Sequence, residues 1–365
     1  MEVLTLEKIC EAKSSNIAQK DLENNNGCYP IYGASGFIKN VDFYKFERPY
    51  LAIVKDGAGV GRVMSLPGKS SIIGTMQAIL PNDNIDIDYL FYYLKSKNLG
   101  KYYTGATIPH IYFKDYKKEK CNVYSLEEQR IVSKKLKLID SMIDYKNKQI
   151  EQLNQLIKSQ FVEMFGTVKN NKYNYEIKSL SDVFELIKDG THSTPTYTDD
   201  KENGVKFLSA KDVTTGKINW SDIKYIPTEL HEVLSKRIKP QKGDILLCKN
   251  GTTGICAKVD VDELFDIYVS LALLRPNLGY NIDYLVEAIN SFDTKKQFDS
   301  SLKGIGVPNL HLGEIAKAKI LVPPLELQNR FAQIVEQIDK QKFEFENSLK
   351  KLEELQASLM QEYFG

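Results

Sequence analysis

One long stretch of this chain occurs twice. It first runs from Leu126 to Gly166 as LEEQRIVSKKLKLIDSMIDYKNKQIEQLNQLIKSQFVEMFG, and it returns from Leu325 to Gly365 as LELQNRFAQIVEQIDKQKFEFENSLKKLEELQASLMQEYFG. The copies have equal length and align without a gap, from a shared Leu-Glu at the start to a shared Phe-Gly at the end. A duplication of this kind sets the architecture before any local pattern is considered.

Each copy is predicted to form one long helix with an apolar seam. Neither copy contains Gly or Pro before its final Gly, so nothing in the sequence interrupts the helix. Apolar residues recur every seven positions, which is typical of a coiled coil. Matched lengths and matched ends favour pairing of the two helices with each other, and the alternative is two independent amphipathic helices. The predicted seam consists of Leu136, Ile143, Ile150 and Ile157 in the first copy, and of Phe331, Ile338, Phe345, Leu352 and Leu359 in the second.

The duplication extends into the segments that precede the two helices. The segment from Tyr50 to Val63 lies over the one from Asp244 to Val259, and each is predicted to be a strand, a glycine-rich turn and a second strand. Residues 85–96 and 280–291 are each predicted to be a short helix behind an Asp cap. We therefore expect two globular domains, at residues 1–125 and 167–324, with long spacer helices at residues 126–166 and 325–365.

Length and composition indicate a protein of two domains with neutral overall charge. The chain has 365 residues, is 42% hydrophobic and carries a formal net charge of +1. No apolar run approaches the ~18 to 20 residues that span a membrane. The five cysteines show no CxxC spacing and the four histidines are scattered, which predicts reduced thiols in the cytoplasm and no metal site. A chain that held nucleic acid by itself would usually be more basic, so DNA binding would be confined to small patches or shared with partner subunits.

Two glycine-rich motifs resemble nucleotide-binding loops but lack their context. The GAGVG segment from Gly57 to Gly61 is followed by RVMSL, which is predicted to be a strand, whereas a phosphate-binding loop requires a helix there. The PGKSS segment from Pro67 to Ser71 has Val63 where a P-loop requires Gly. Neither a methylase motif of the NPPY type nor a nuclease cluster is evident, so no catalytic residue is assigned.

Polar and basic residues gather instead at the glycine-rich turns of both domains. Lys and Arg can bind phosphates, whereas Arg, Asn, Gln, Ser and Thr can also contact base edges. Any one of them is more readily explained as a solvated hairpin tip, but their presence at equivalent places in both domains favours DNA contact. The candidates are Tyr32, Ser35, Lys55, Asp56, Arg62, Thr75, Gln77 and His110 in the first domain, and His192, Lys211, Lys249, Asn250, Thr252, Thr253 and Lys258 in the second.

These repeated segments resemble those of the specificity (S) subunits of type I restriction-modification systems. The resemblance covers essentially the whole chain, although the first copy has Tyr124-Ser125 where the second has Pro323-Pro324. The segments that carry it are VPPLELQNRFAQIVEQIDK (Val322 to Lys340), YSLEEQRIVSKKLKLID (Tyr124 to Asp140), YPIYGASG (Tyr29 to Gly36) and KNGTTG (Lys249 to Gly254).

The resemblance implies an α+β protein with two target-recognition domains, related by a pseudo-twofold axis and separated by two antiparallel coiled-coil helices. Such a protein would read an asymmetric, bipartite site on double-stranded DNA, with half-site centres ~34 Å apart. It further implies that two methyltransferase subunits dock around the helices, and that translocase–nuclease subunits add cleavage where they are present. S-adenosylmethionine, ATP and Mg²⁺ would then be bound by the partner subunits, and this chain would carry no catalytic activity.

Two other functions are compatible with the residues alone. The first is a stand-alone DNA methyltransferase or nuclease whose site is assembled from distant residues of the globular domains. The second is a coiled-coil scaffold without a DNA role. The first predicts activity of the purified chain, and the second predicts partner binding without a sequence-dependent footprint.

Overall fold

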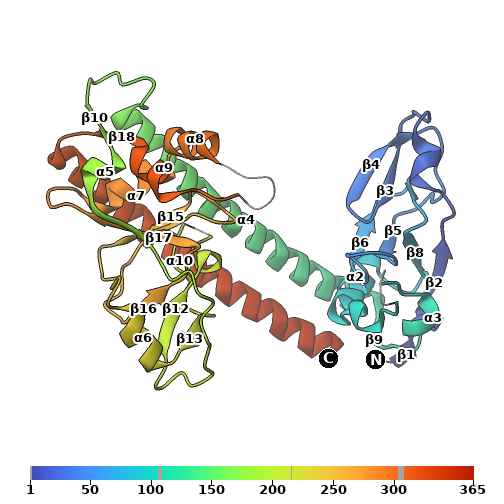
Figure 1. Ribbon diagram of the computed structural model, residues 1–365. Coiled ribbons are helices and arrows are strands. Elements are labelled where there is room, and N and C mark those ends of the chain that lie inside the picture. The colour runs from blue at the N-terminus through green and yellow to red at the C-terminus, as the bar shows by residue number, and fades with distance from the viewer. Residues whose placement is uncertain (1, 106–108, 215, 303–307) are drawn as a thin grey trace. The chain divides into compact units, whose positions relative to one another are not determined.

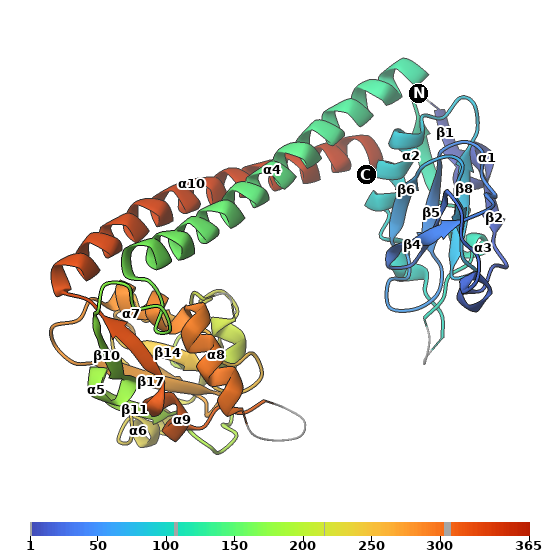
Figure 2. The ribbon, with the colours of Figure 1, turned by 90° about the horizontal axis from the view of Figure 1, so that it is seen from above.

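The computed structural model describes residues 2–105, 109–214, 216–302 and 308–365. It divides into two compact units, of which unit 1 comprises Met1–Lys148 with Phe345–Gly365 and unit 2 comprises Gln149–Glu344. Two long helices, α4 (Leu126–Phe165) and α10 (Leu325–Phe364), each contribute one end to each unit. Both helices can be followed from end to end without a break (Figures 1 and 2). Each unit therefore combines one globular domain with one end of each long helix.

The globular part of unit 1 contains three small sheets. Their strand orders are β2-β8-β5-β6, β4-β3-β7 and β1-β9. Among the described residues of unit 1, all strand pairs are antiparallel except β3 with β7. The strands are β1 (Glu2–Thr5), β2 (Cys10–Ser14), β3 (Tyr29–Gly33), β4 (Gly36–Val41), β5 (Tyr50–Val54), β6 (Val63–Leu66), β7 (Ser71–Ile72), β8 (Met76–Pro81) and β9 (Lys120–Val123), and the helices are α1 (Leu6–Ile9), α2 (Ile87–Ser96) and α3 (Phe113–Tyr116).

Unit 2 repeats this topology strand for strand. Its sheets have the orders β11-β17-β14-β15, β13-β12-β16 and β10-β18, and again a single pair, β12 with β16, is parallel. The α+β class and the internal duplication are therefore confirmed. The strands are β10 (Glu176–Ser179), β11 (Phe184–Asp189), β12 (Val205–Leu208), β13 (Lys224–Ile226), β14 (Ile245–Cys248), β15 (Cys256–Lys258), β16 (Phe265–Ile267), β17 (Leu271–Pro276) and β18 (Lys319–Val322), and the helices are α5 (Leu180–Val183), α6 (Thr228–Leu234), α7 (Ile282–Asn290), α8 (Phe292–Ser301) and α9 (Leu312–Lys317).

The strand that leads into the glycine-rich turn is buried on both faces in each unit. Along β14, Ile245 and Leu247 face one apolar cluster, whereas Leu246 and Cys248 face a second cluster on the other side of the sheet. Successive side chains of a strand point to opposite faces, so a strand covered on both sides is an unbroken apolar run. β5 in unit 1 follows the same pattern. The turn after each of these strands is thus attached to a strand that is packed on both faces.

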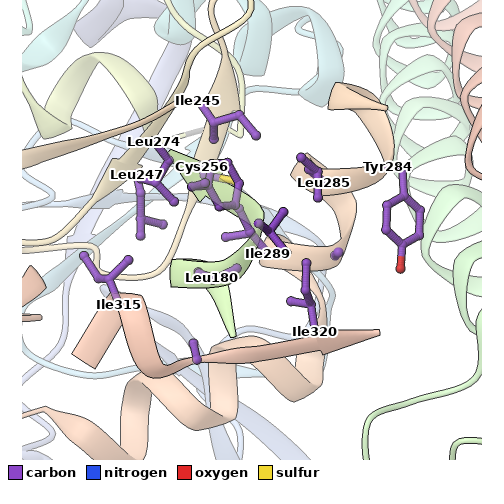
Figure 3. Packing of buried hydrophobic residues seen from close by; sticks show 14 of the residues in the cluster. Leu180, Ile245, Leu247, Cys256, Leu274, Tyr284, Leu285, Ile289, Ile315 and Ile320 are labelled. Carbon is purple, nitrogen blue, oxygen red and sulfur yellow. The ribbon is translucent and has the colours of Figure 1, made fainter. Parts of the chain in front are cut away.

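The main core of unit 2 joins its sheet to its helices. Figure 3 shows Ile245, Leu247 and Leu274 of the sheet packed with Leu285 and Ile289 of α7. The same cluster takes in residues of both long helices, among them Ile157, Phe161 and Phe165 of α4 and Phe331, Val335 and Ile338 of α10. The helix ends are therefore part of the core of the domain.

The long helices run antiparallel where they meet in unit 1. The amide nitrogen of Gln356 in α10 donates a hydrogen bond of 2.5 Å to Oδ1 of Asp140 in α4. Further along α4, the ammonium of Lys146 lies 4.3 Å from the ring centroid of Phe345. The partner number falls as the α4 number rises, which is the antiparallel order.

Aromatic rings join the same two helices in unit 2. The Phe331 ring of α10 lies 5.4 Å from that of Phe161 and 5.6 Å from that of Phe165. Each predicted seam residue of both helices is buried or half-buried. The seven-residue apolar period thus marks the less exposed side of each helix.

A buried glutamine fixes the start of each long helix in the same way. Gln129 Oε1 accepts a hydrogen bond from the Asp86 amide, and its Nε2 donates to the carbonyl of Tyr124. Gln328, its equivalent in α10, accepts from the Asn281 amide and donates to the carbonyl of Pro323. These bonds satisfy backbone groups that the nearby turns leave unpaired.

The helix caps agree with the sequence in unit 1 and differ in unit 2. Asp86 caps α2 as expected, because its carboxylate accepts from the Tyr89 amide. The expected Asp cap of α7 is wrong: Asn281 fills that position, and Asp283 lies in the first turn. Asn and Asp cap equally well, so the error is one of register only.

Each long helix ends on a buried phenylalanine. Phe165 packs against Tyr284 in unit 2, with ring centroids 4.9 Å apart, and Phe364 packs against Tyr89 in unit 1 at 5.0 Å. Gly166 follows with a φ of +77°, a conformation that glycine adopts without strain. Phenylalanine therefore anchors the end of each long helix, and Gly166 terminates α4.

Candidate nucleic-acid interface

The glycine-rich turn of unit 1 is held by a segment that follows α2 in the chain. The Gly57 amide donates to the carbonyl of Pro109 at 2.9 Å, and the Ile111 amide donates to the carbonyl of Lys55 at 2.9 Å. These bonds fix the backbone of the turn. The turn continues into the strand β6, so the sequence-based rejection of a phosphate-binding loop agrees with the structure.

The same clasp is present in unit 2. The Gly251 amide donates to the carbonyl of Pro308 at 3.3 Å, and the Leu310 amide donates to the carbonyl of Lys249 at 2.8 Å. The sequence gave no sign that these segments pair. We call the turn and its bound segment the clasped loop of each unit.

An arginine ties the clasped loop of unit 1 to a neighbouring turn. Arg62 donates from NH2 to the carbonyl of Ala34, at 2.8 Å, in the turn between β3 and β4. A Cβ on Gly59 would lie 2.5 Å from the same nitrogen, so this glycine makes room for the guanidinium. Within the described residues, Lys55 has no side-chain hydrogen bond or ion pair and is half-buried.

Aromatic and basic side chains flank the clasped loop of unit 1. His110, whose backbone pairs with Asp56, lies with its ring centroid 5.4 Å from that of the exposed Tyr112. The ammonium of Lys114 lies 5.4 Å from the Tyr112 ring centroid. The sequence pointed to His110 but missed Tyr112 and Lys114, two and four residues further along the chain, because nothing in the sequence showed that this segment binds the glycine-rich turn.

A buried carboxylate organises the corresponding place in unit 2. Asp189, only 4% exposed, accepts from Lys249 at 2.9 Å on Oδ2 and from Arg237 at 2.8 Å on Oδ1. His192 lies 3.1 Å from the same Oδ2. Arg237 also donates from NH1 to the carbonyl of Gly190 at 2.7 Å. We call Asp189, His192, Arg237 and Lys249 the Asp189 cluster.

The electrostatics of this cluster favour an ionised Asp189. Its burial would by itself raise the carboxyl pKa, but the hydrogen bonds from Lys249 and Arg237 outweigh that effect and lower the pKa below its ordinary value. One carboxylate thus faces two permanent cations. The cluster keeps a surplus of positive charge at the ends of β11 and β14.

Comparison with known proteins bears directly on these repeated domains. The family model of the type I restriction modification DNA specificity domain matches residues 1–155 and again residues 172–357. The chain belongs to this family.

Relatives of known function agree with this assignment. The chain is 28% identical to the type I restriction enzyme MjaVIII specificity subunit of Methanocaldococcus jannaschii, over 87% of this chain and 81% of that protein. It is 23% identical to the EcoKI specificity subunit of Escherichia coli strain K12, over 85% of this chain and 72% of the relative.

Solved structures share the fold. The S subunit of a type I restriction-modification system from M. genitalium has a TM-score of 0.60 at 16% identity and covers 100% of this chain and 96% of its own. A chain from a study of complex assembly and conformational transition in a type I system has a TM-score of 0.56 at 15% identity, with 100% and 97% coverage. Because the family model matches both halves of the chain and the relatives are specificity subunits, the protein is a specificity subunit, the non-catalytic part that supplies DNA sequence specificity.

Several predicted contact residues of the specificity subunit are interior. Thr75 is half-buried, and its hydroxyl oxygen is shielded from solvent with no partner among the described residues. Gln77 is buried and accepts from the Tyr116 hydroxyl at 3.2 Å. Tyr32 packs edge-on against Phe37 at 6.1 Å, whereas Ser35 at the tip of that turn is exposed. Of these four, Ser35 alone is exposed.

The remaining candidates of unit 2 divide between two places. Thr252 and Lys211 are exposed, the latter beside Asp212 at 3.8 Å, whereas Thr253 is buried. The Asn250 side-chain oxygen is buried without a partner in the described ranges. Lys258 lies apart from the clasped loop: it pairs with Asp283 of α7 and lines a groove of about 930 Å³ that also borders the long helices.

Equivalent positions of the two units carry different chemistry. Lys55 and Lys249 occupy the same place after β5 and β14, yet only Lys249 is buried in an ion pair. Asp189 has Ser14 as its counterpart at the end of β2, because Ser14 pairs with Gln77 as Asp189 pairs with Ala272. Sequence reasoning missed Asp189 and Arg237, since their contact joins residues far apart in the chain. Asp189-Gly190 at a strand end was the one local signal available.

Proposed function

We propose that this specificity subunit reads an asymmetric, bipartite site on double-stranded DNA, with one half-site contacted by the clasped loop of each unit. The observation that carries the proposal is the repetition of the clasped loop on identical strand topology with different side chains around it. A shared scaffold supports the same mode of approach to DNA, and different side chains select different bases. The two half-sites should therefore differ in sequence.

The chemistry of each clasped loop suits DNA. Lysine and arginine neutralise phosphates, and arginine in particular binds base edges in the major groove. Arg62 in unit 1 and Arg237 in unit 2 are both held beside the clasped loop by backbone carbonyls. Aromatic groups such as Tyr112 add a flat surface for contact with sugars or bases.

The long helices offer a surface for partner subunits. On α4, Ile131, Leu138, Met142 and Tyr145 are all exposed, with Leu138 at 62%. Their spacing places them on one stripe of the helix, separate from the buried seam residue Leu136. Contiguous apolar surface of this kind marks interaction sites. We propose that methyltransferase subunits dock here, and that restriction subunits join through them where they are present.

Catalysis would then belong to the partners. We propose that S-adenosylmethionine, ATP and Mg²⁺ are bound by the partner subunits, and that this chain selects the site at which they act. The purified chain with DNA, Mg²⁺ and S-adenosylmethionine should transfer no methyl group, and addition of the methyltransferase subunits should restore transfer. Methylation by the chain alone would refute this division of labour.

An exchange of domains tests the two-reader proposal. Residues 1–124 are replaced by the corresponding domain of another family member, and the sites methylated in the host are determined by methylome sequencing. One half-site should change and the other should stay the same. A change in both half-sites, or in neither, would contradict independent readout by two domains.

A further inference from the structure

We propose that Arg237 is a specificity-determining residue that reads a guanine in the half-site of unit 2, and that Asp189 is the positioning residue that aims it. The inference rests on the proposed function, since it assumes that the clasped loop of unit 2 faces DNA.

The guanidinium of Arg237 is fixed before DNA arrives. NH2 donates to Oδ1 of Asp189 at 2.8 Å and NH1 donates to the carbonyl of Gly190 at 2.7 Å, so both terminal nitrogens are held. The side chain is nevertheless 48% exposed. Each terminal nitrogen carries a second N–H group, and Nε carries one more, all of which stay available to an outside acceptor. Arg237 is therefore both immobile and accessible.

The other basic residues of the Asp189 cluster are not suited to reading a base. Lys249 is buried, and its ammonium donates to Oδ2 of Asp189 at 2.9 Å, so it neutralises the carboxylate from inside. This inner ion pair leaves the charge of Arg237 uncompensated toward solvent. His192 is exposed but forms a single contact with the carboxylate, at 3.1 Å, and gives no planar fork.

The fixed orientation favours a base edge over a phosphate. A phosphate accepts from many directions, so it requires no fixed orientation and can also be bound, as by a point charge, by a mobile lysine such as the exposed Lys236 next to it. A guanine offers two acceptors, O6 and N7, in one plane, which match the planar fork of an arginine. Holding a long side chain in advance lowers the conformational entropy lost on binding. The Asp189 cluster thus has the features of a base reader.

The counterpart in unit 1 has a different arrangement. Ser14 replaces Asp189, and the Lys55 side chain has no ion pair among the described residues. Arg62 there comes from the clasped loop itself and bonds to Ala34 rather than to a carboxylate. Guanine reading through a carboxylate-held arginine is accordingly expected in the half-site of unit 2 alone.

The test uses the full chain assembled with its methyltransferase subunits and a duplex that carries the methylated site found in the host. The variants are Arg237→Ala, Arg237→Lys and, as matched control, Lys236→Ala. Arg237→Ala and Arg237→Lys should weaken binding to the site roughly 5- to 150-fold while changing binding to an unrelated duplex little. Methylome sequencing should show relaxed selection at one position of one half-site. Lys236→Ala should weaken binding to both duplexes alike.

Base and phosphate contacts are separated by altered DNA. Each guanine of the half-site is replaced in turn by 7-deazaguanine, which lacks the N7 acceptor but still pairs with cytosine. One replacement should weaken binding of the unmodified complex and have no further effect on Arg237→Ala. If no 7-deazaguanine matters and neutral methylphosphonate linkages do, Arg237 contacts phosphate and the inference is wrong.

Two further results distinguish a failure of the Arg237 inference from a failure of the proposed function. Asp189→Asn, checked for an unchanged thermal transition, should lose discrimination as Arg237→Ala does. A variant of Arg237 that keeps the full sequence preference contradicts this inference alone. An unmodified complex without any sequence preference contradicts the proposed function itself.

Discussion

Stability of unit 2 should depend on pH through a pair of carboxyl groups that unit 1 lacks. In unit 1 the Tyr92 hydroxyl of α2 donates to Asp140 of α4 at 2.6 Å. The equivalent residues in unit 2 are Glu287 of α7 and Asp339 of α10, so a hydroxyl donor is replaced by a second acid. Both line the 930 Å³ groove, and Lys342 lies 3.3 Å from Asp339.

This pairing changes the titration of Glu287. Burial and then the charge of Asp339 raise its pKa from 4.5 to about 7, against the opposing charges of Lys342 and Lys158. The folded chain therefore holds this proton more tightly than the unfolded chain does. The resulting stabilisation is complete below about pH 4.5 and is lost as the pH rises through about 7.

The magnitude follows from the size of the pKa shift. At 1.36 kcal/mol per unit, the shift corresponds to at most ~3 kcal/mol, and solvent screening of the half-buried side chain reduces it to roughly 1–2 kcal/mol. Glu287→Gln removes the charge and keeps the shape. The variant should therefore exceed the unmodified chain in stability by that amount at pH 8, and the advantage should vanish toward pH 4.5.

Urea unfolding of the full chain at intervals between pH 4.5 and 8 measures the effect. The relevant quantity is the difference in unfolding free energy between Glu287→Gln and the unmodified chain, because this difference cancels the titration of the carboxyls that do not interact with Glu287. Glu229→Gln, at an exposed glutamate of the same unit, serves as the matched control. Parallel stability curves for Glu287→Gln and the unmodified chain would refute the reasoning.

Three further predictions concern the helices. Phe331→Ala, at a fully buried ring, should destabilise unit 2 by about 3–5 kcal/mol in urea unfolding, whereas Phe343→Ala, at a ring that is 63% exposed, should cost little; equal losses would contradict the assigned packing. Gln129→Leu should cost roughly 1–3 kcal/mol by the same assay, because it leaves buried backbone groups unpaired, and a neutral result would show that water replaces it. Leu138→Glu should leave the melting temperature unchanged and abolish co-purification with methyltransferase subunits; retained assembly would place the docking surface elsewhere.

Much of the architecture could be predicted from the sequence because its signals are local or repeated. The seven-residue apolar period and the lack of Gly and Pro predicted α4 and α10, and the repetition itself predicted two domains of one topology. The unbroken apolar run from Tyr50 to Val54 predicted a strand ahead of a glycine-rich turn. Membership of the specificity-subunit family also followed from these repeated segments.

The candidate interface depended on contacts that no local pattern contains. In the described part of the chain, the clasp between Lys55 and Ile111 and the contact of Asp189 with Arg237 both join residues that are far apart in the sequence. Gln77 appeared available for base contact, yet the fold buries it against Tyr116. The type of a residue and its neighbours in the chain determine which contacts are chemically possible. Burial and charge pairing decide which of them remain open to DNA, and both are set by the tertiary structure.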